Sequence, residues 1–275
     1  MKNIALKSIM AVCVAALMIT VSCKRTTNTA DEKNLEAAKD NAFAEIMYND
    51  IQSIADEASE VQTGGSLENY KTASNCATIT HDTLSTPKTI TIDFGATNCL
   101  CNDGKYRRGQ ILVSYMGFYK DSGSMHTITF NQYFVNDNQI LGTKQVVNNG
   151  HNSINQLNFS VTVNGLIIKA TSLDSIIWNH NRLRTMIQGE NTTVKYDDVY
   201  SITGSGSGQR ANGVPYTMNI VQPLIKAMNC QWIKEGIMEI QPQGASIRSI
   251  DYGNGNCDNQ ATVTVNGNTF TITLN

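Results

Sequence analysis

The stretch QATVTVNGNTFTITL, residues 260–274, decides the fold class of this chain. Polar and apolar residues alternate along both halves of the stretch, and Asn266-Gly267 lies between the halves. Alternation is the pattern of a strand that buries one face. Asn-Gly is the pair that a two-residue hairpin turn prefers, because both turn positions need a positive φ. The stretch therefore predicts two antiparallel strands joined by a tight turn.

The same pattern recurs along the chain from Cys76 onward. Further alternating runs occupy residues 88–94, 110–119, 125–135, 157–163, 194–203, 214–221 and 233–240. Turn sequences separate the runs: Asn102-Asp103-Gly104, Asp121-Ser122-Gly123, Asn149-Gly150, Asn164-Gly165, Gln188-Gly189 and Asn212-Gly213. No helical crossover pattern lies between the runs, which argues against an α/β fold. We expect a mainly β protein whose residues 76–275 form a single antiparallel meander, as a curved sheet, a half-barrel or a sandwich.

Residues 34–63 have a different period. Apolar residues recur there every three or four positions: Leu35, Ala38, Ala42, Ile46, Ile54, Ala58 and Val61. This spacing predicts one long N-terminal amphipathic helix. The polar face is acidic and contains Glu36, Asp40, Glu45, Asp50, Asp56, Glu57 and Glu60. Because anionic lipids would repel this face, we expect the helix to pack on the protein's own sheet rather than on a membrane or a coiled-coil partner.

The N-terminus has the parts of an export signal in their usual order. Lys2 and Lys7 make the first residues positive, residues 9–21 are almost wholly apolar, and Ser22 precedes Cys23. This order predicts a cleaved secretory signal over residues 1–22. The apolar run is too short to span a bilayer comfortably.

The segment Val21-Ser22-Cys23 resembles the lipobox of bacterial lipoproteins. The resemblance implies that Cys23 carries acyl chains on its sulfur and on its new amino group, which together give a stable membrane anchor. The polar residues 23–33 are expected to form a lipidated, flexible tether. Lys24 resembles the residue that follows the cysteine in lipoproteins sent to the outer membrane. The periplasmic face and the cell surface both remain open.

Charge argues against a nucleic-acid partner. The chain carries 21 basic and 23 acidic residues, and loss of the signal with Lys2 and Lys7 leaves 19 basic residues and a net charge of −4. Proteins that bind a phosphate backbone carry a basic patch or stripe, and the sequence contains no such stripe. The membrane, reached through the lipid, is the partner that the sequence predicts.

Five cysteines remain after the signal and the lipidated residue are set aside: Cys76, Cys99, Cys101, Cys230 and Cys257. An exported protein meets an oxidising compartment, so disulfides are permitted. In a weak internal repeat, one cysteine precedes and another follows each of the motifs Ile92-Asp93-Phe94-Gly95 and Ile250-Asp251-Tyr252-Gly253. The repeat suggests the bridges Cys76–Cys99 and Cys230–Cys257, although Cys101 is also a possible partner for Cys76. A metal site at Cys99-x-Cys101 lacks the usual Cys-x2-Cys spacing and a second ligand pair.

One acidic loop has the residue types of a calcium site. Its oxygen ligands are spaced two to three residues apart among glycines, at Asp251, Asn254, Asn256 and Asp258. Hydrogen-bonded Asx turns account for the same residues and are the interpretation that we prefer. The sequence therefore predicts no firm metal site and no cofactor.

Two other motifs invite a catalytic interpretation. The run Gly204-Ser205-Gly206-Ser207-Gly208 lacks the features of a nucleophile elbow and the lysine of a phosphate loop, and it predicts a flexible loop or an irregular strand. The pair Asp197-Asp198 would point to opposite faces of a strand, which is unsuited to joint acid–base catalysis. No catalytic residue is predicted.

Four motifs together resemble a group of uncharacterised Bacteroidota lipoproteins. They are Ile92-Asp93-Phe94-Gly95, the run DGKYRRG at residues 103–109, Trp178 with Arg182 and Arg184, and Asp197-Asp198-Val199-Tyr200. The resemblance extends from the lipobox to the C-terminus. It implies the envelope location and the single β domain, and it brings no activity, ligand or catalytic residue with it.

These observations favour an envelope lipoprotein with a non-enzymatic binding or structural role. Three alternatives make distinct structural predictions. A surface adhesin or glycan-binding protein predicts an exposed aromatic strip on one face of the sheet. An apolar-ligand carrier predicts a large apolar pocket with the helix as a lid. A carbohydrate hydrolase predicts two carboxylates in one cleft, roughly 5–10 Å apart.

Overall fold

The computed structural model describes residues 35–61, 76–192 and 194–274. The helices in these ranges are α2 (Glu36–Val61) and the short 3₁₀-helix η2 (Lys195–Asp197). The strands are β1 (Thr78–Asp82), β2 (Lys88–Asp93), β3 (Cys99–Leu100), β4 (Tyr106–Met116), β5 (Met125–Val135), β6 (Asn138–His151), β7 (Leu157–Ile168), β8 (Ser175–Gln188), β9 (Val199–Gln209), β10 (Pro215–Ala227), β11 (Glu235–Pro242), β12 (Arg248–Asn254), β13 (Gln260–Val265) and β14 (Asn268–Thr273). The predicted signal, the predicted lipidation site Cys23 and the predicted tether lie outside the described residues.

All the strands belong to one antiparallel sheet. Their order in the sheet follows their order in the chain from β1 to β14, except that β3 pairs with β4 beside this path. The path ends at β1 and β14, so the sheet does not close on itself. The prediction of a mainly β fold, built as one antiparallel meander with a single long N-terminal helix, is confirmed. Within the described residues no helix has the length and apolarity to cross a bilayer.

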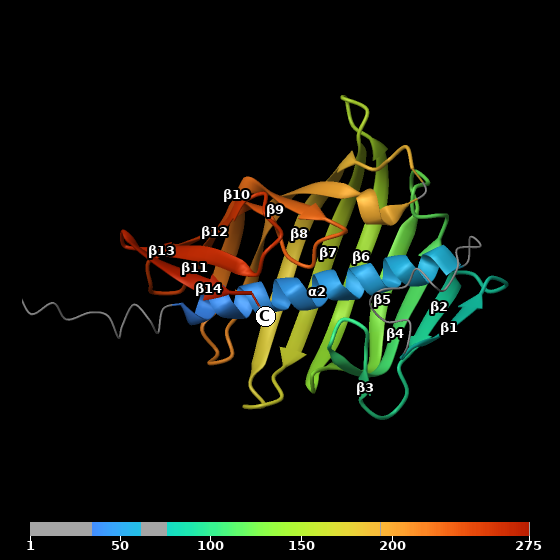
Figure 1. Ribbon diagram of the computed structural model, residues 1–275, viewed down its shortest axis with the longest axis horizontal. Coiled ribbons are helices and arrows are strands. Elements are labelled where there is room, and N and C mark those ends of the chain that lie inside the picture. The colour runs from blue at the N-terminus through green and yellow to red at the C-terminus, as the bar shows by residue number, and fades with distance from the viewer. Residues whose placement is uncertain (1–34, 62–75, 193, 275) are drawn as a thin grey trace, which may run out of the picture. The chain divides into compact units, whose positions relative to one another are not determined.

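Helix α2 crosses one face of the sheet (Figure 1). It contacts β2, β4, β8 and β11, which belong with it to the compact unit of residues 34–275. From β2 to β11 the sheet order contains eight steps between neighbouring strands, or roughly 38 Å at about 4.8 Å per step. A helix of 26 residues is about 39 Å long. The helix is therefore long enough to reach from β2 to β11 across the sheet.

The sheet buries more of α2 than its apolar stripe. Asp40, Glu45, Asp50 and Asp56 are also buried, although an acidic helix face would ordinarily meet solvent. Three of them pair with cations of the sheet: Asp40 with Lys169 at 2.6 Å, Glu45 with Arg182 at 2.6 Å and Asp50 with Arg107 at 2.8 Å. The acidic face of the helix is thus an ion-pairing surface, because the strands opposite it carry inward-facing cations.

Two of the predicted Asn-Gly turns are wrong. Asn164-Gly165 lies inside β7, and Asn149-Gly150 lies inside β6. At Gly165 an added Cβ would lie 2.5 Å from the Tyr48 hydroxyl, so glycine admits the tyrosine of α2 against the strand. At Gly150 the glycine has a φ of +79° beside a β-bulge. Glycine within a strand marks a close approach or a bulge as readily as a turn.

The strand expected over residues 194–203 begins later than predicted. Lys195–Asp197 forms η2, and the strand starts at Val199. Asp197 and Asp198 therefore do not sit on a strand: Asp197 ends η2, and the backbone N–H of Asp198 donates to the carbonyl of Lys195. The prediction that these two carboxylates alternate across a sheet was wrong, because both residues precede Val199, where the strand begins.

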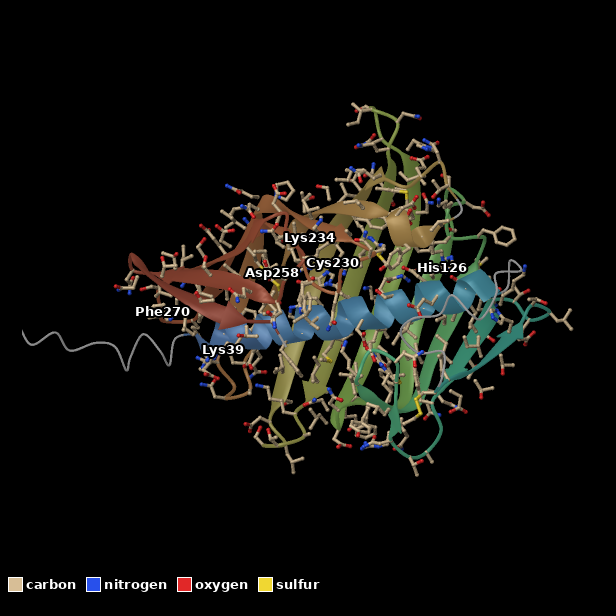
Figure 2. All side chains as sticks on the ribbon, viewed as in Figure 1. Lys39, His126, Cys230, Lys234, Asp258 and Phe270 are labelled. Carbon is tan, nitrogen blue, oxygen red and sulfur yellow. A yellow bond between two sulfur atoms is a disulfide. The ribbon has the colours of Figure 1, made fainter. Side chains whose placement is uncertain are left out.

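Two disulfides join the pairs that the repeat suggests, Cys76–Cys99 and Cys230–Cys257, with Cα–Cα distances of 5.7 and 5.8 Å. Cys101 is buried and unbridged. In each repeat the aspartate accepts a hydrogen bond from the glycine N–H two residues later, at 2.8 Å for Asp93 and 2.9 Å for Asp251. Figure 2 labels Cys230 and also Asp258, the residue after Cys257. The second bridge ties the β10–β11 connection to the β12–β13 connection.

Candidate functional site

Strand β8 carries charged side chains on its inward face. Every second residue is buried: Ile176, Trp178, His180, Arg182, Arg184 and Met186. Alternate residues of a strand share one face, and this face meets α2, since the Trp178 indole N–H donates to Asn41 Oδ1 at 2.9 Å. The outward positions include the exposed Leu183 and Ile187. This reversal of the usual polarity is why β8 was not predicted as a strand.

The glycine run of β9 makes room for these large side chains. Gly204, Gly206 and Gly208 pair directly with Arg182, His180 and Trp178. An added Cβ at Gly206 would lie 2.8 Å from the Cβ of His180, and one at Gly204 would lie 2.8 Å from the Cα of Arg182. Directly paired residues point to the same face of a sheet. The run is therefore part of a strand whose missing side chains leave space above β8 and β9.

A cavity lies between this part of the sheet and the middle of α2. Its lining comes from α2 (Tyr48, Asn49, Gln52, Ser53), from β6, β7 and β8 (Lys144, Val161, Trp178, His180, Arg182, Arg184), and from β9, β10 and the residues that follow (Ile202, Lys226, Met228). It leaves ≈ 30 Å³ for the centres of water-sized molecules, two to three times the roughly 10–15 Å³ that one water needs. Four of the lining residues are lysine or arginine, and none is aspartate or glutamate.

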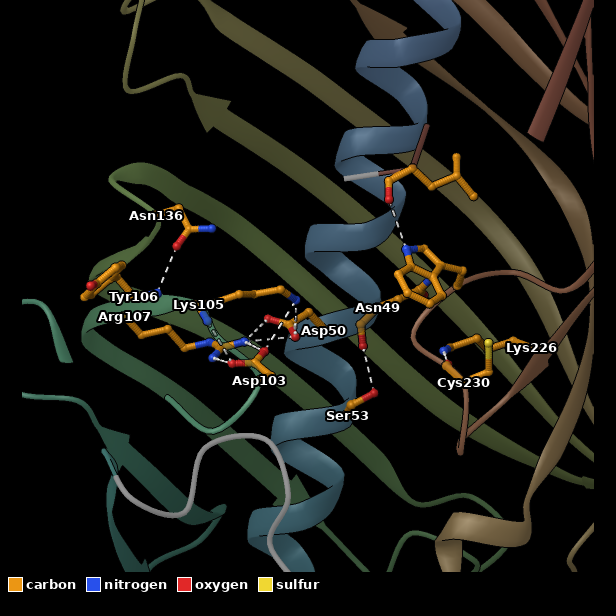
Figure 3. Close-up of polar contacts among 12 residues, drawn as sticks. Asn49, Asp50, Ser53, Asp103, Lys105, Tyr106, Arg107, Asn136, Lys226 and Cys230 are labelled. Atoms are coloured by element: carbon orange, nitrogen blue, oxygen red, sulfur yellow. Dashed lines mark hydrogen bonds and ion pairs between the residues drawn. The ribbon is translucent and has the colours of Figure 1, made fainter. Parts of the chain in front are cut away.

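Lys144 and Lys226 bring buried amines to this cavity. Lys144 is 5% exposed and donates a hydrogen bond to the carbonyl of Tyr48 at 3.1 Å, and Lys226 is 6% exposed and donates to the carbonyl of Cys230. Burial, and after it the positive charge of Arg184, lowers the pKa of each lysine to about 7. Figure 3 shows Lys226 beside Cys230, with Asn49 and Ser53 on the neighbouring helix. Both lysines therefore sit between their charged and neutral forms near neutral pH.

Arg184 is the fixed positive charge of the cavity. It is 6% exposed, and a guanidinium keeps its proton in proteins. It donates to the Tyr119 hydroxyl at 3.2 Å and to Met228 Sδ at 3.6 Å, and it stacks 3.5 Å from the centroid of the Tyr200 ring. Across the described part of the chain, no carboxylate forms an ion pair with Arg184, Lys144 or Lys226.

Two other residues of β8 complete the wall. Arg182 is compensated by Glu45 of α2, at 2.6 Å, and lies 5.2 Å from the Trp178 ring centroid. His180 is a neutral imidazole, because burial holds its pKa well below the usual range and the charges of Arg182 and Lys144 lower it further. The Nδ1 atom of His180 has no hydrogen-bond partner in the described structure. The imidazole thus adds a nitrogen without a hydrogen-bond partner to a cavity lining that contains four cationic residues.

Asp56 and Asp198, whose charges act on Arg184, form hydrogen bonds with other side chains. Asp56 Oδ1 accepts a hydrogen bond from Gln52 at 2.9 Å, and Asp198 Oδ2 accepts one from the Tyr200 hydroxyl at 3.0 Å. Burial raises the pKa of Asp198 to about 6. Neither carboxylate lines the cavity.

A second charged cluster lies at another part of α2 and is balanced. The fully buried Arg107 contacts Asp50 at 2.8 Å and Asp103 at 2.6 Å, while Lys105 contacts the same carboxylates at 2.9 and 3.6 Å (Figure 3). Two acids face two bases. This cluster joins α2 to β4 and leaves no charge for a ligand.

The remaining sequence candidates lie away from the cavity. In the acidic loop at residues 251–258, Asp251 and Asp258 accept backbone hydrogen bonds from Gly253 and Gln260, each at 2.9 Å. Among the described residues, no group of three histidine, cysteine, aspartate or glutamate side chains is placed to hold a metal ion. The exposed aromatic residues Tyr106, Phe118 and Tyr196 lie on three different segments.

Sequence reasoning found only part of the cavity. Trp178, Arg182 and Arg184 were singled out as a motif, but Lys144 and Lys226 were not. The feature that could have identified these two lysines is their inward position in a strand. Lys144 lies between Gly142 and Val146 in β6, and Lys226 lies two residues after Leu224 in β10. Comparison of the chain with known protein families, with curated proteins and with solved structures found no match.

Proposed function

We propose that this protein is an envelope lipoprotein, held at the outer membrane by lipid on Cys23, that binds a small anion without chemical change. The observation that carries the binding role is that Lys144, Arg184 and Lys226 line one cavity, and that no carboxylate among the described residues forms an ion pair with any of them. The anchor is supported by the sequence pattern Val21-Ser22-Cys23.

The physical argument concerns the cost of a buried charge. Taking an ion out of water costs several kcal/mol, and a protein recovers this by pairing the ion or avoids the cost by neutralising the group. Glu45 and Asp50 of α2, together with Asp103, show that this protein pairs other buried cations, namely Arg107 and Arg182. An anion in the cavity would accept charge-assisted hydrogen bonds from Lys144, Arg184 and Lys226. A binding role therefore accounts for charges that the fold alone does not explain.

The cavity differs from what the other functions require. An apolar-ligand carrier needs a wall free of buried charges, whereas this wall holds four cationic residues and one histidine beside apolar residues such as Val161 and Ile202. A carbohydrate hydrolase needs a carboxylate pair in its cleft, and the lining contains no carboxylate. These features favour the binding of an anion over both alternatives.

The test is anion titration of the processed lipoprotein, purified in detergent. Calorimetry with sodium sulfate and sodium acetate should show one anion bound per chain, and Trp178 gives a second readout through its fluorescence. We expect Arg184→Met to weaken binding at least ~10-fold, or about 1.4 kcal/mol. Arg210→Met, at the end of β9, is the matched control and should bind as the parent does. Equal affinity of the Arg184→Met variant and the parent would refute the proposal.

A further inference from the structure

We infer that the cavity takes a tetrahedral dianion, namely a phosphate or sulfate ion or the phosphoryl group of a larger molecule, rather than a carboxylate. This inference rests on the proposed function and names the class of its ligand. It follows from the number of cations, from the directions in which they approach, and from the size of the cavity.

The number of cations exceeds what a carboxylate needs. A carboxylate offers two oxygens and one charge, whereas a phosphoryl group offers three oxygens and a charge of about −1.5 to −2 at pH 7. The protein already contains a buried carboxylate that forms an ion pair with one arginine, in the 2.6 Å pair of Glu45 and Arg182. The cavity instead gathers two lysines and Arg184, all nine-tenths buried. Three cations match a dianion.

The cations also approach from different directions. In the order of the sheet, β6 lies two strands to one side of β8, and β10 lies two strands to the other side. The backbones of Lys144 and Lys226 therefore lie on opposite sides of the backbone of Arg184, each about 10 Å away across the sheet. The side chains of both lysines line the same cavity. A planar carboxylate is suited to a single guanidinium fork. A tetrahedral anion presents oxygens in several directions, as this arrangement demands.

The third side of the cavity adds neutral polar groups. Asn49, Gln52 and Ser53 of α2 face the strands across it, and His180 contributes an imidazole. The space for ≈ 30 Å³ of water-sized centres suits a compact group of four oxygens. It is too small for a sugar ring or an acyl chain, so only the charged end of a larger ligand would enter.

The first experiment compares anions on the processed lipoprotein in detergent, at pH 7 and constant ionic strength. Calorimetric titrations use sulfate, inorganic phosphate, glycerol 3-phosphate and acetate. We expect every dianion that binds to bind at least 10-fold more tightly than acetate. Binding of glycerol 3-phosphate as tight as that of phosphate would identify a phosphorylated molecule as a ligand source, and binding of the inorganic ions alone would identify a free ion. Acetate binding as tightly as the dianions would overturn the inference and leave the proposed function intact. Absence of binding by all four anions would overturn both.

The second experiment separates a binding role of the lysines from a structural one. Lys144→Met and Lys226→Met each remove a buried charge that forms no ion pair within the described residues, so the ligand-free variants should melt at the same temperature as the parent or higher. Each variant should also lose most of the preference for dianions over acetate. Lys88→Met, on β2, is the control and should change neither property. A lower melting temperature with the preference unchanged would show that the lysines serve the fold, and would overturn the inference.

Discussion

At the scale of single residues, glycine decides where α2 touches the sheet. The Tyr48 hydroxyl donates to the carbonyl of Leu141 at 2.7 Å and accepts from the N–H of Leu166 at 3.1 Å. The ring of Tyr48 also stacks on Trp178, with 5.4 Å between centroids. These contacts require the tyrosine to lie directly over Gly165. A side chain at that position would exclude it.

Gly165→Ala should therefore destabilise the protein. The new Cβ would lie 2.5 Å from the Tyr48 hydroxyl, and overpacking of this kind costs about 1–3 kcal/mol. Chemical denaturation measures the change in the free energy of unfolding. In a Tyr48→Ala background the same substitution should cost almost nothing, because the collision is gone. An equal cost in both backgrounds would place the effect in the backbone rather than in the contact with Tyr48.

The two cavity lysines predict how stability and binding depend on pH. In the folded protein the pKa of each is about 7, well below the value of 10.5 for a free lysine. The charged groups that act on them are Glu45, Asp50 and Asp56 of α2, Lys105 of the β3–β4 connection, and Arg182 and Arg184 of β8. From pH 7 to about pH 10 the unfolded chain binds more protons at these residues than the folded chain does. Stability must therefore rise with pH in that window.

We expect the ligand-free protein to gain stability from pH 7 to pH 9, by at most about 1.4 kcal/mol per pH unit for each lysine. Sulfate affinity should fall over the same range, since sulfate keeps its charge while the lysines lose theirs. Denaturant unfolding and calorimetry measure the two trends. The double variant Lys144→Met/Lys226→Met is the control and should flatten both. A parent protein whose stability and affinity do not change over this range would contradict the assignment.

At the scale of elements, the second disulfide supports the cavity. The Cys230 carbonyl is the hydrogen-bond acceptor of Lys226, and Cys230 is tied to Cys257. The first disulfide, between Cys76 and Cys99, ties the segment before β1 to β3 and has no residue in the cavity. The two bridges have similar sequence separations, 23 and 27 residues. They form a matched pair for an experiment.

Cys230→Ser/Cys257→Ser should weaken sulfate binding several-fold, because the acceptor that positions Lys226 loses its tether. Cys76→Ser/Cys99→Ser should leave the affinity unchanged. Both double variants should lose about 3 kcal/mol of stability, as loops of this length predict. Calorimetric titration with sulfate, under conditions where each variant is folded, compares the affinities of the two double variants with that of the parent. Equal affinities in the two variants would show that the bridge plays no part in the site.

The elements also show what the sequence could and could not predict. Alternation identified β13 and β14 and the turn between them, because one face of each strand is apolar and the other polar. It missed β8, whose buried face carries His180, Arg182 and Arg184. It also misassigned Asn164-Gly165, because a turn and a close approach both select glycine. In each case a contact with a distant element decided the outcome, and local pattern contains no information on it.

At the scale of the whole molecule, the order of the strands in the sheet brings the cavity residues together. Lys144, Arg184 and Lys226 lie on β6, β8 and β10, and the helix above them comes from the start of the chain. The disulfide pairs could be inferred from an internal repeat, since both copies are visible in the sequence. The cavity could not, because a lone lysine in an alternating strand does not reveal which other residues it will meet.

The predicted lipid on Cys23 would hold the whole domain at the outer membrane. We expect the parent chain to fractionate with the outer membrane and the Cys23→Ala variant to leave it, because the acyl chains are lost. Immunoblots of membrane and soluble fractions measure this. Protease treatment of intact cells then assigns the domain to the cell surface if it is digested, or to the periplasmic face if it is protected until the envelope is broken. Identical fractionation of the two chains would rule out lipid anchoring.

The long reach of α2 across the sheet sets the order in which the chain can fold. The helix precedes every strand, yet the amide of Asn41 contacts Met238, which lies 197 residues later. During synthesis the apolar stripe and the acids of the helix therefore stay uncovered on their β11 side until β11 has emerged. Contacts so distant in sequence slow folding, and an uncovered apolar surface invites aggregation in the meantime. The same helix that gives the cavity its third side therefore leaves the nascent chain exposed to aggregation until the last part of the sheet is made.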